Sequence, residues 1–233
     1  MIKIRKSSDR GHFQNSWLTS SHTFSFSEYY DPSHMHFKHL RVINEDYIAA
    51  NGGFGSHDHH DMEIMTYMIS GELEHKDSMG NSSVIKAGEI QFMRAGKLVT
   101  HSEFNPSSTE TSHLLQIWIM PNQKGLKPEY HQKFYSKADK ENKLCKIATG
   151  DINDSVFQIA QNIDIYASIL DKSQKLIHTL KNNESAWVQI VTGELEINNI
   201  KLTSGDGAAI EIEELLSIQS NMDNTEFLLF HFK

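Results

Sequence analysis

Short apolar segments recur through the first half of the chain, separated by glycine, asparagine and proline. They are rich in β-branched and aromatic residues, and few stretches show a helical period, so they are typical of strands. The clearest ones lie at residues 41–43, 63–69, 89–93 and 114–120. Short strands at nearly regular spacing predict an antiparallel sandwich or barrel.

The pattern of the first half is repeated in the second half. Residues 67–74 and residues 189–196 each consist of an apolar segment, a glycine and the sequence Glu-Leu-Glu. In both copies a second turn follows, in which a small residue, a glycine and an acidic residue stand around Gly88 and Gly205. Two matched turns in the same order predict a duplicated β domain.

The duplication predicts an all-β chain of two domains. We expect an N-terminal domain at residues 1–123, a polar connection at residues 124–146, and a reduced C-terminal domain at residues 147–233. The connection is rich in charged residues, which is typical of a linker.

Composition narrows the functional classes. The 233 residues are 38% hydrophobic and carry 22 Lys and Arg against 30 Asp and Glu, a formal net charge of -8. A chain without a basic cluster is poorly suited to direct nucleic-acid binding, because it lacks the cations that displace counterions. The longest apolar run, residues 114–120, is too short to span a membrane. The single cysteine, Cys145, and the lack of a signal-peptide pattern lead us to expect a cytoplasmic protein.

Two pairs of side chains could bind a metal ion. Successive residues of a strand point to opposite faces. His57 and His59 therefore lie on one face of their strand, and His101 and Glu103 lie on one face of theirs. If the two strands are neighbours, they offer three imidazole nitrogens and one carboxylate oxygen to a divalent transition metal. Four protein groups leave coordination positions open for a reactant.

Other histidines fit less well. The corresponding places in the second copy hold Thr179, Lys181 and residues 218–220, and the nearby His178 is expected to have no partner. We therefore expect that only the first copy kept the ligands. His75 follows a turn and is expected to face solvent. Four further histidines are expected in a solvated loop: His22, His34, His36 and His39.

Several motifs across residues 20–120 resemble the pirin family of the cupin superfamily. The matching stretches are residues 22–26, 29–32, 40–44, 53–54, 57 and 59, 63, 66–67, 71, 74–75, 77–78, 80–81, 88, 95–96 and 101–103. The resemblance implies a bicupin fold with metal in the N-terminal barrel, held by His57, His59, His101 and Glu103. Many other cupins take their carboxylate ligand from the first motif, which here is Glu63.

The sequence departs from the pirin pattern at the mouth of the expected pocket. Ser56 and Asp58 stand where pirins usually have prolines, and Lys97-Leu98 follows Gly96 where a second glycine is usual. Asp58 points away from the metal by strand alternation, so the ligands are kept. The departures leave substrate preference open.

The resemblance implies an enzyme, a quercetin 2,3-dioxygenase that uses dioxygen to cleave a flavonol ring. Iron(II) is the first choice of metal, and copper, nickel, manganese and zinc also suit these ligands. Glu103 is the candidate general base for the substrate hydroxyl. The alternative is a non-enzymatic metal or redox sensor that binds a basic patch on a partner protein, as the family also permits. A third reading is a metal-dependent isomerase or hydrolase.

Overall fold

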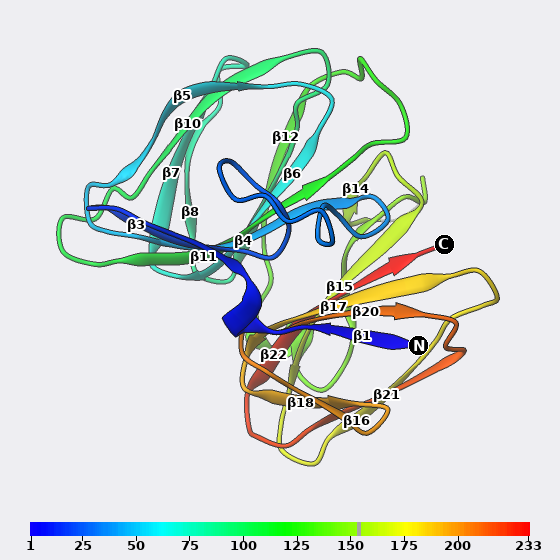
Figure 1. Cartoon of the computed structure of the whole chain (residues 1–233). Helices are drawn as coiled ribbons and strands as arrows, with labels where there is room; N and C mark the ends of the chain where they lie inside the picture. Colours follow the sequence, from blue (N-terminus) through cyan, green and yellow to red (C-terminus); the bar gives the residue numbers. More distant parts are fainter. Residues whose placement is uncertain (153–154) are drawn as a thin grey trace. The chain divides into compact units, whose positions relative to one another are not determined.

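The structure is a computed structural model that describes residues 1–152 and 155–233. The described residues form two compact units, each built from a seven-stranded and a four-stranded sheet (Figure 1). In the unit of residues 11–135 the larger sheet runs β12 (Glu129–Phe134), β9 (Glu89–Arg94), β6 (Glu63–Ser70), β11 (Ser112–Ile119), β4 (Leu40–Ile48), β3 (Leu18–His22), β2 (Gly11–Gln14). Its smaller sheet runs β5 (Gly53–His59), β10 (Val99–Phe104), β7 (Glu72–Asp77), β8 (Ser82–Lys86).

The other unit consists of residues 1–10 and 136–233 and repeats this plan. Its larger sheet runs β1 (Ile2–Arg5), β20 (Gly207–Glu211), β17 (Ser185–Thr192), β22 (Thr225–Phe232), β15 (Ile163–Leu170), β13 (Cys145–Thr149), β14 (Phe157–Gln158). Its smaller sheet runs β16 (Lys175–Thr179), β21 (Leu215–Ser220), β18 (Glu194–Ile197), β19 (Ile200–Thr203). Two short helices, η1 (Ser7–Asp9) and α1 (Lys137–Lys140), complete it. The all-β, two-domain architecture is therefore confirmed.

The repeated turns have the same backbone conformation in both units. Gly71 joins β6 to β7 with φ +75°, and Gly193 joins β17 to β18 with φ +88°. A Cβ at Gly71 would lie 2.9 Å from the Cα of Ser112, so both the positive φ and the space favour glycine. The expected duplication thus corresponds to equivalent strands at equivalent sheet positions.

Each unit has an apolar core between its two sheets. In the N-terminal unit, Leu73 and Ile85 of the smaller sheet pack with Leu18, Ile48, Met68 and Leu114 of the larger sheet. In the C-terminal unit the equivalent layer is mostly apolar, with Leu195, Ile197 and Ile218 fully buried. This mostly apolar layer contrasts with the polar inner face of β5 and β10, which is described below.

The boundaries of the units differ from those expected at residues 123 and 147. Residues 124–146 include β12, which pairs with β9, and the start of β13, where Cys145 is half-buried. The first strand, β1, pairs with β20 and so belongs with the C-terminal half of the sequence. Strands β12 and β1 lie at sheet edges and carry many polar residues, which explains why their composition suggests a connection.

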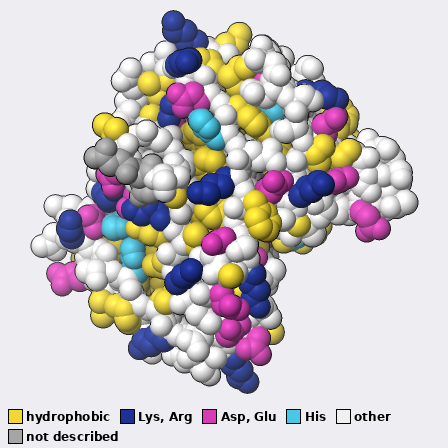
Figure 2. Space-filling view, turned by 180° about the vertical axis from the view of Figure 1, so that it is seen from behind, with side chains coloured by type: hydrophobic (Ala, Val, Ile, Leu, Met, Phe, Trp, Pro, Cys, Tyr) yellow, Lys and Arg dark blue, Asp and Glu magenta, His cyan; other side chains and the backbone are white. Residues whose placement is uncertain are grey.

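The surface is mixed in charge. On the face shown in Figure 2, Lys and Arg side chains are scattered among Asp and Glu. None of the helices in the described ranges has the length and hydropathy needed to cross a membrane.

Candidate metal centre

The two predicted metal-binding segments are neighbouring strands. β5 and β10 pair antiparallel, with His57 directly opposite His101. Opposite residues of an antiparallel pair point to the same face. The register therefore brings the His57 and His59 side chains close to those of His101 and Glu103. Between His101 and Glu103 the register shifts by one residue, which places Glu103 opposite Phe54. The extra residue lies on β5 and forms a β-bulge, which bends this strand beside the site.

Three imidazoles meet on this face. The ring centroids of His57 and His101 are 4.5 Å apart, and His59 lies 4.8 Å from each of them. One ligand nitrogen from each ring lies within 4.8 Å of the others. Trp118 packs edge-on against His59 at 4.9 Å, which limits the rotation of that ring. The cluster is thus compact enough for three rings to face one ion.

Hydrogen bonds and burial leave the ring nitrogens suited to coordination. Nδ1 of His57 lies 2.8 Å from the carbonyl oxygen of Gly55, which can only accept, so Nδ1 carries the hydrogen and Nε2 keeps its lone pair. Nε2 of His101 is buried and has no hydrogen-bond partner among the residues that the structure describes. A buried polar atom without a partner is costly, and a bound ion would satisfy it.

Burial keeps the rings of His59 and His101 neutral. It lowers the pKa of His59 to about 4, with further contributions from the imidazoles of His101 and His57. Burial likewise lowers the pKa of His101 to about 3, helped by His57 and His75. Metal binding requires the neutral imidazole, so the site does not need to release protons from these two rings near neutral pH.

Glu103 lies buried beside His101 and is held by neutral donors. Gln116 donates through Nε2 to Oε2 of Glu103 at 2.9 Å. Gln91 Nε2 and Thr66 Oγ1 lie 3.4 and 3.5 Å from Oε1. These three donors are neutral, so the carboxylate charge is available to a metal ion.

Glu63, the other candidate carboxylate, lies in a different environment. Its Oε1 accepts a hydrogen bond from Nε of Arg94 at 2.7 Å, and its side chain is fully buried. Arg94 also binds Glu129 at 2.8 Å. Glu63 is therefore engaged in an ion pair and does not line the cavity that Glu103 lines.

His75 was expected to face solvent, and this expectation is wrong. It is 0% exposed, lies opposite Glu103 in the register of β7 and β10, and stacks on Tyr130 at 4.7 Å. The alternation of Leu73, His75 and Asp77 with polar outward residues is the signal that would have placed it inside. His75, His101 and Glu103 form a second group whose ligand atoms lie within 4.8 Å of one another.

A cavity of about 760 Å³ opens onto the imidazole cluster. His57, His59, His101 and Glu103 all line it, so its chemistry is that of the cluster. Much of the remaining lining is aromatic: Phe13, Trp17, Phe26, Tyr29, Phe54 and Trp118. This volume lies within the range of small-molecule sites, which are typically apolar with a few polar groups.

The polar part of the cavity includes a residue that sequence reasoning had placed in a loop. His22 lies at the end of β3, is buried, and its Nδ1 is 3.0 Å from Oδ1 of Asn44. The solvated-loop expectation for His22 is therefore wrong, whereas His34, His36 and His39 lie outside the strands. Asp46 lies nearby, bonded to the hydroxyl of Ser20.

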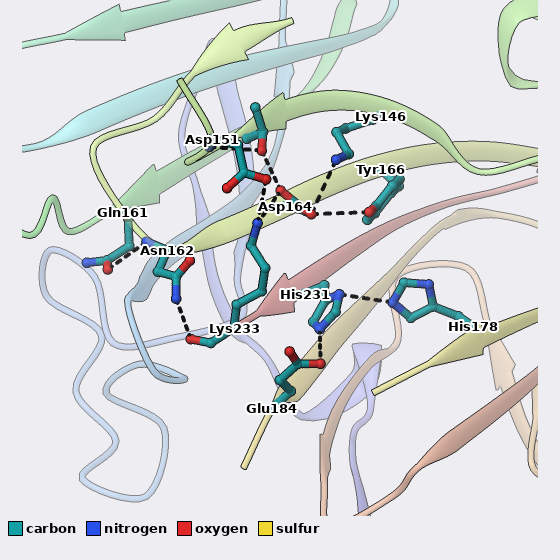
Figure 3. Close-up of polar contacts among 11 residues, drawn as sticks. Lys146, Asp151, Gln161, Asn162, Asp164, Tyr166, His178, Glu184, His231 and Lys233 are labelled. Carbon is teal, nitrogen blue, oxygen red and sulfur yellow. Dashed lines mark hydrogen bonds and ion pairs between the residues drawn. The ribbon is translucent and has the colours of Figure 1, made fainter. Parts of the chain in front are cut away.

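His178 in the C-terminal unit does have a partner, contrary to expectation. Its Nε2 lies 3.2 Å from Nδ1 of His231, whose Nε2 lies 2.9 Å from Glu184 (Figure 3). The described residues offer no cluster of three potential ligands in this unit.

Two jelly-roll units of equivalent topology, one with three histidines clustered on paired strands and one without such a cluster among its described residues, define a bicupin protein. A family model described as Pirin matches residues 3–119, and one described as Quercetinase C-terminal cupin domain matches residues 146–232. The chain belongs to the pirin family.

Known relatives and solved structures match nearly the whole length of this chain. A protein of Escherichia coli (strain K12) named quercetin 2,3-dioxygenase is 44% identical over 99% of this chain and 98% of its own length. A pirin-like protein of Caulobacter vibrioides is 35% identical, with 97% of each chain covered. The crystal structure of the bacterial pirin YhhW of Escherichia coli in complex with nickel(II) has a TM-score of 0.95 and 44% identity, covering 100% of this chain and 99% of that one.

Proposed function

We propose that this protein is a metal-dependent dioxygenase that cleaves the ring of quercetin-like flavonols. In this proposal His57, His59, His101 and Glu103 hold one divalent transition metal ion. The observation that carries it is the buried, unpartnered Nε2 of His101 among three converging imidazoles at a large cavity. The names of the relatives support the same substrate class.

The donor set fits a transition metal. Three neutral imidazoles and one carboxylate suit iron, nickel, copper, manganese or zinc, and iron(II) remains our first choice for oxygen chemistry. When bound, the ion would supply a Lewis-acid and redox-active position for the substrate hydroxyl and dioxygen. The His57 and His101 rings present their Nε2 atoms to this ion in the proposal.

Glu103 is proposed as both ligand and base. Its carboxylate accepts hydrogen bonds from the amide of Gln116 and weaker ones from Gln91, and these neutral donors orient it without neutralising its charge. An oriented anion at the cavity wall can accept the proton of a flavonol hydroxyl. Glu63 is poorly suited to be the ligand or the base, because moving its carboxylate would break its buried ion pair with Arg94.

The cavity suits a planar aromatic substrate. Phe26, Phe54 and Trp118 provide ring faces and edges for aromatic contacts. His22, Asn44 and Asp46 provide polar groups that can bind peripheral hydroxyls. The low-dielectric wall strengthens these polar contacts and keeps bulk water from the reacting groups.

The test is aerobic turnover of quercetin by protein loaded with iron(II) or nickel(II). We expect loss of flavonol absorbance with matching oxygen uptake and carbon monoxide release. His57→Ala is expected to lose metal and activity together. His60→Ala is the matched control, because this neighbouring imidazole is 74% exposed.

The outcomes separate the candidate functions. Full metal occupancy without turnover of any flavonol would contradict the dioxygenase and leave the metal or redox sensor. Equal turnover without oxygen would favour a metal-dependent isomerase or hydrolase. Metal retained by His57→Ala at the level of His60→Ala would contradict the proposed ligand set.

A further inference from the structure

Two side chains behind the imidazole cluster, His75 and Asp77, form a row with His101, and none of the proposed steps uses these two. Oδ2 of Asp77 lies 3.0 Å from Nε2 of His75, and Nδ1 of His75 lies 3.4 Å from Nδ1 of His101. The side chains of His75 and Asp77 are 0% exposed, and His101 is 2% exposed. The row is therefore shielded from water, and its hydrogen atoms are assigned by its own donors and acceptors.

The carboxylate of Asp77 fixes the direction of both hydrogen bonds, the one to His75 and the one between His75 and His101. A carboxylate can only accept, so Nε2 of His75 carries a hydrogen, and Nδ1 of that ring in its uncharged form is an acceptor. The facing atom, Nδ1 of His101, must then donate. The neutral His101 ring consequently has its lone pair on Nε2, the atom that is buried without a partner.

We propose that Asp77 and His75 are positioning residues that fix the tautomer and orientation of His101 for metal binding. The inference rests on the metal site proposed above. His57 reaches the same tautomer by donating from Nδ1 to the carbonyl oxygen of Gly55. His101 has a two-residue relay instead, because its Nδ1 faces the side chains of β7.

The relay is itself held rigid. Oδ1 of Asp77 accepts hydrogen bonds from the backbone N–H groups of Met79 and Asn81, which form the tip of the β7–β8 hairpin. The side-chain amide of Asn81 donates to Oδ2 at 2.8 Å. Tyr130 stacks on His75 with an interplanar angle of 27°. Asp77 and His75 therefore both have contacts that fix their rotamers.

The charge state of Asp77 agrees with its role as the hydrogen-bond acceptor of the row. Burial opposes ionisation of Asp77, but hydrogen bonds from Asn81 and His75 outweigh it and hold the pKa of the carboxyl below its ordinary value. An ionised Asp77 is the acceptor that the row requires.

The substitution Asp77→Asn reverses the direction of the hydrogen bonds along the row, while the side chain keeps nearly the same shape. The new oxygen can still accept from the backbone of Met79 and Asn81, while the new NH₂ group faces Nε2 of His75. The side-chain amide of Asn81, which donates to Oδ2 in the wild type, must turn over and present its oxygen to this NH₂ group. His75 must then donate from Nδ1, which forces the hydrogen of His101 onto Nε2, where the metal would bind. Loss of such an outer partner typically costs about 10- to 100-fold in metal affinity.

The primary readout is nitrogen-15 NMR of histidine-labelled protein after chelator treatment. Long-range proton–nitrogen correlations distinguish the two tautomers of a neutral ring. We expect the His101 hydrogen on Nδ1 in the wild type and on Nε2 in Asp77→Asn. This readout does not require metal, so it tests the relay even if the proposed metal site is wrong. The same tautomer in both proteins would overturn the relay.

The second readout is Ni²⁺ affinity by calorimetry. We expect Asp77→Asn and His75→Phe each to weaken Ni²⁺ binding about 10- to 100-fold, and Asp77→Asn to add no further loss in the His75→Phe background. A further tenfold loss there would overturn the relay. His75→Phe keeps a ring against Tyr130 and serves as the test if Asp77→Asn does not fold.

Asp58→Asn is the matched control, because Asp58 is an exposed carboxylate between two proposed ligands and binds Thr100 on the outer face. It is expected to bind Ni²⁺ as the wild type does. A loss equal to that of Asp77→Asn would overturn the relay. Absence of Ni²⁺ binding in the wild type, or wild-type affinity in His57→Ala, would instead contradict the proposed metal site.

Discussion

Replacing Asp46 with asparagine is expected to make the metal-free protein more stable at neutral and alkaline pH. Asp46 is 3% exposed at the cavity wall, and burial raises its pKa from 3.8 to about 7. The negative charges of Glu103 and Glu45 add to the effect, while the hydrogen bond from Ser20 opposes it. Folding therefore makes this carboxyl harder to ionise.

The sign and the magnitude follow from proton linkage. Between the unfolded and folded pKa values the folded chain holds a proton that the unfolded chain has lost, so the free energy of unfolding falls as pH rises. The contribution is complete below the unfolded pKa and is lost as pH rises through about 7. Each pKa unit corresponds to about 1.4 kcal/mol, so the full shift is worth about 4 kcal/mol. About 2.5 kcal/mol of it falls between about pH 5 and pH 8.

The assay is urea unfolding of chelator-treated wild type and Asp46→Asn across this pH range. Asparagine keeps an oxygen for the Ser20 hydroxyl and cannot ionise, so the difference between the two curves isolates Asp46. We expect the variant to gain about 2.5 kcal/mol relative to the wild type from the acidic to the alkaline end. Curves that run parallel across the range would refute the reasoning.

Three further predictions concern the metal centre. His57→Ala and His101→Ala are expected to lose bound Ni²⁺ by elemental analysis, yet keep wild-type far-ultraviolet circular dichroism, because the core is apolar; unfolded variants would contradict this. Ni²⁺ at a hundredfold excess over its Kd is expected to stabilise the fold by about 2.7 kcal/mol in thermal unfolding, and an unchanged Tm would contradict binding to the native state. Glu63→Gln is expected to destabilise the fold by about 3 kcal/mol, since the buried ion pair of Arg94 with Glu63 is lost, while Ni²⁺ affinity is expected to stay at the wild-type value; a large loss of affinity would instead point to Glu63 as a ligand.

The sequence was informative wherever a local rule applied. Strand alternation placed His57 and His59 on one face, and the matched turns at Gly71 and Gly193 revealed the duplicated plan, because a positive φ strongly favours glycine. The segments at residues 63–69 and 89–93 formed strands as predicted. Edge strands such as β12 were missed, since an edge carries polar residues and resembles a linker in composition.

The tertiary structure decided which distant groups meet. Alternation can put His75 on an inner face, but only the pairing of β7 with β10 sets it against His101 with Asp77 behind it. Likewise, Glu63 and Glu103 are equally plausible ligands by residue type, and it is the burial of Arg94 beside Glu63 that separates them. The sequence by itself determined the strands, their repetition and the faces of the histidines, because these depend on neighbours along the chain. The cavity, the relay and the partner of each carboxylate depend on strand register and packing between segments far apart in sequence, so only the folded structure could establish them.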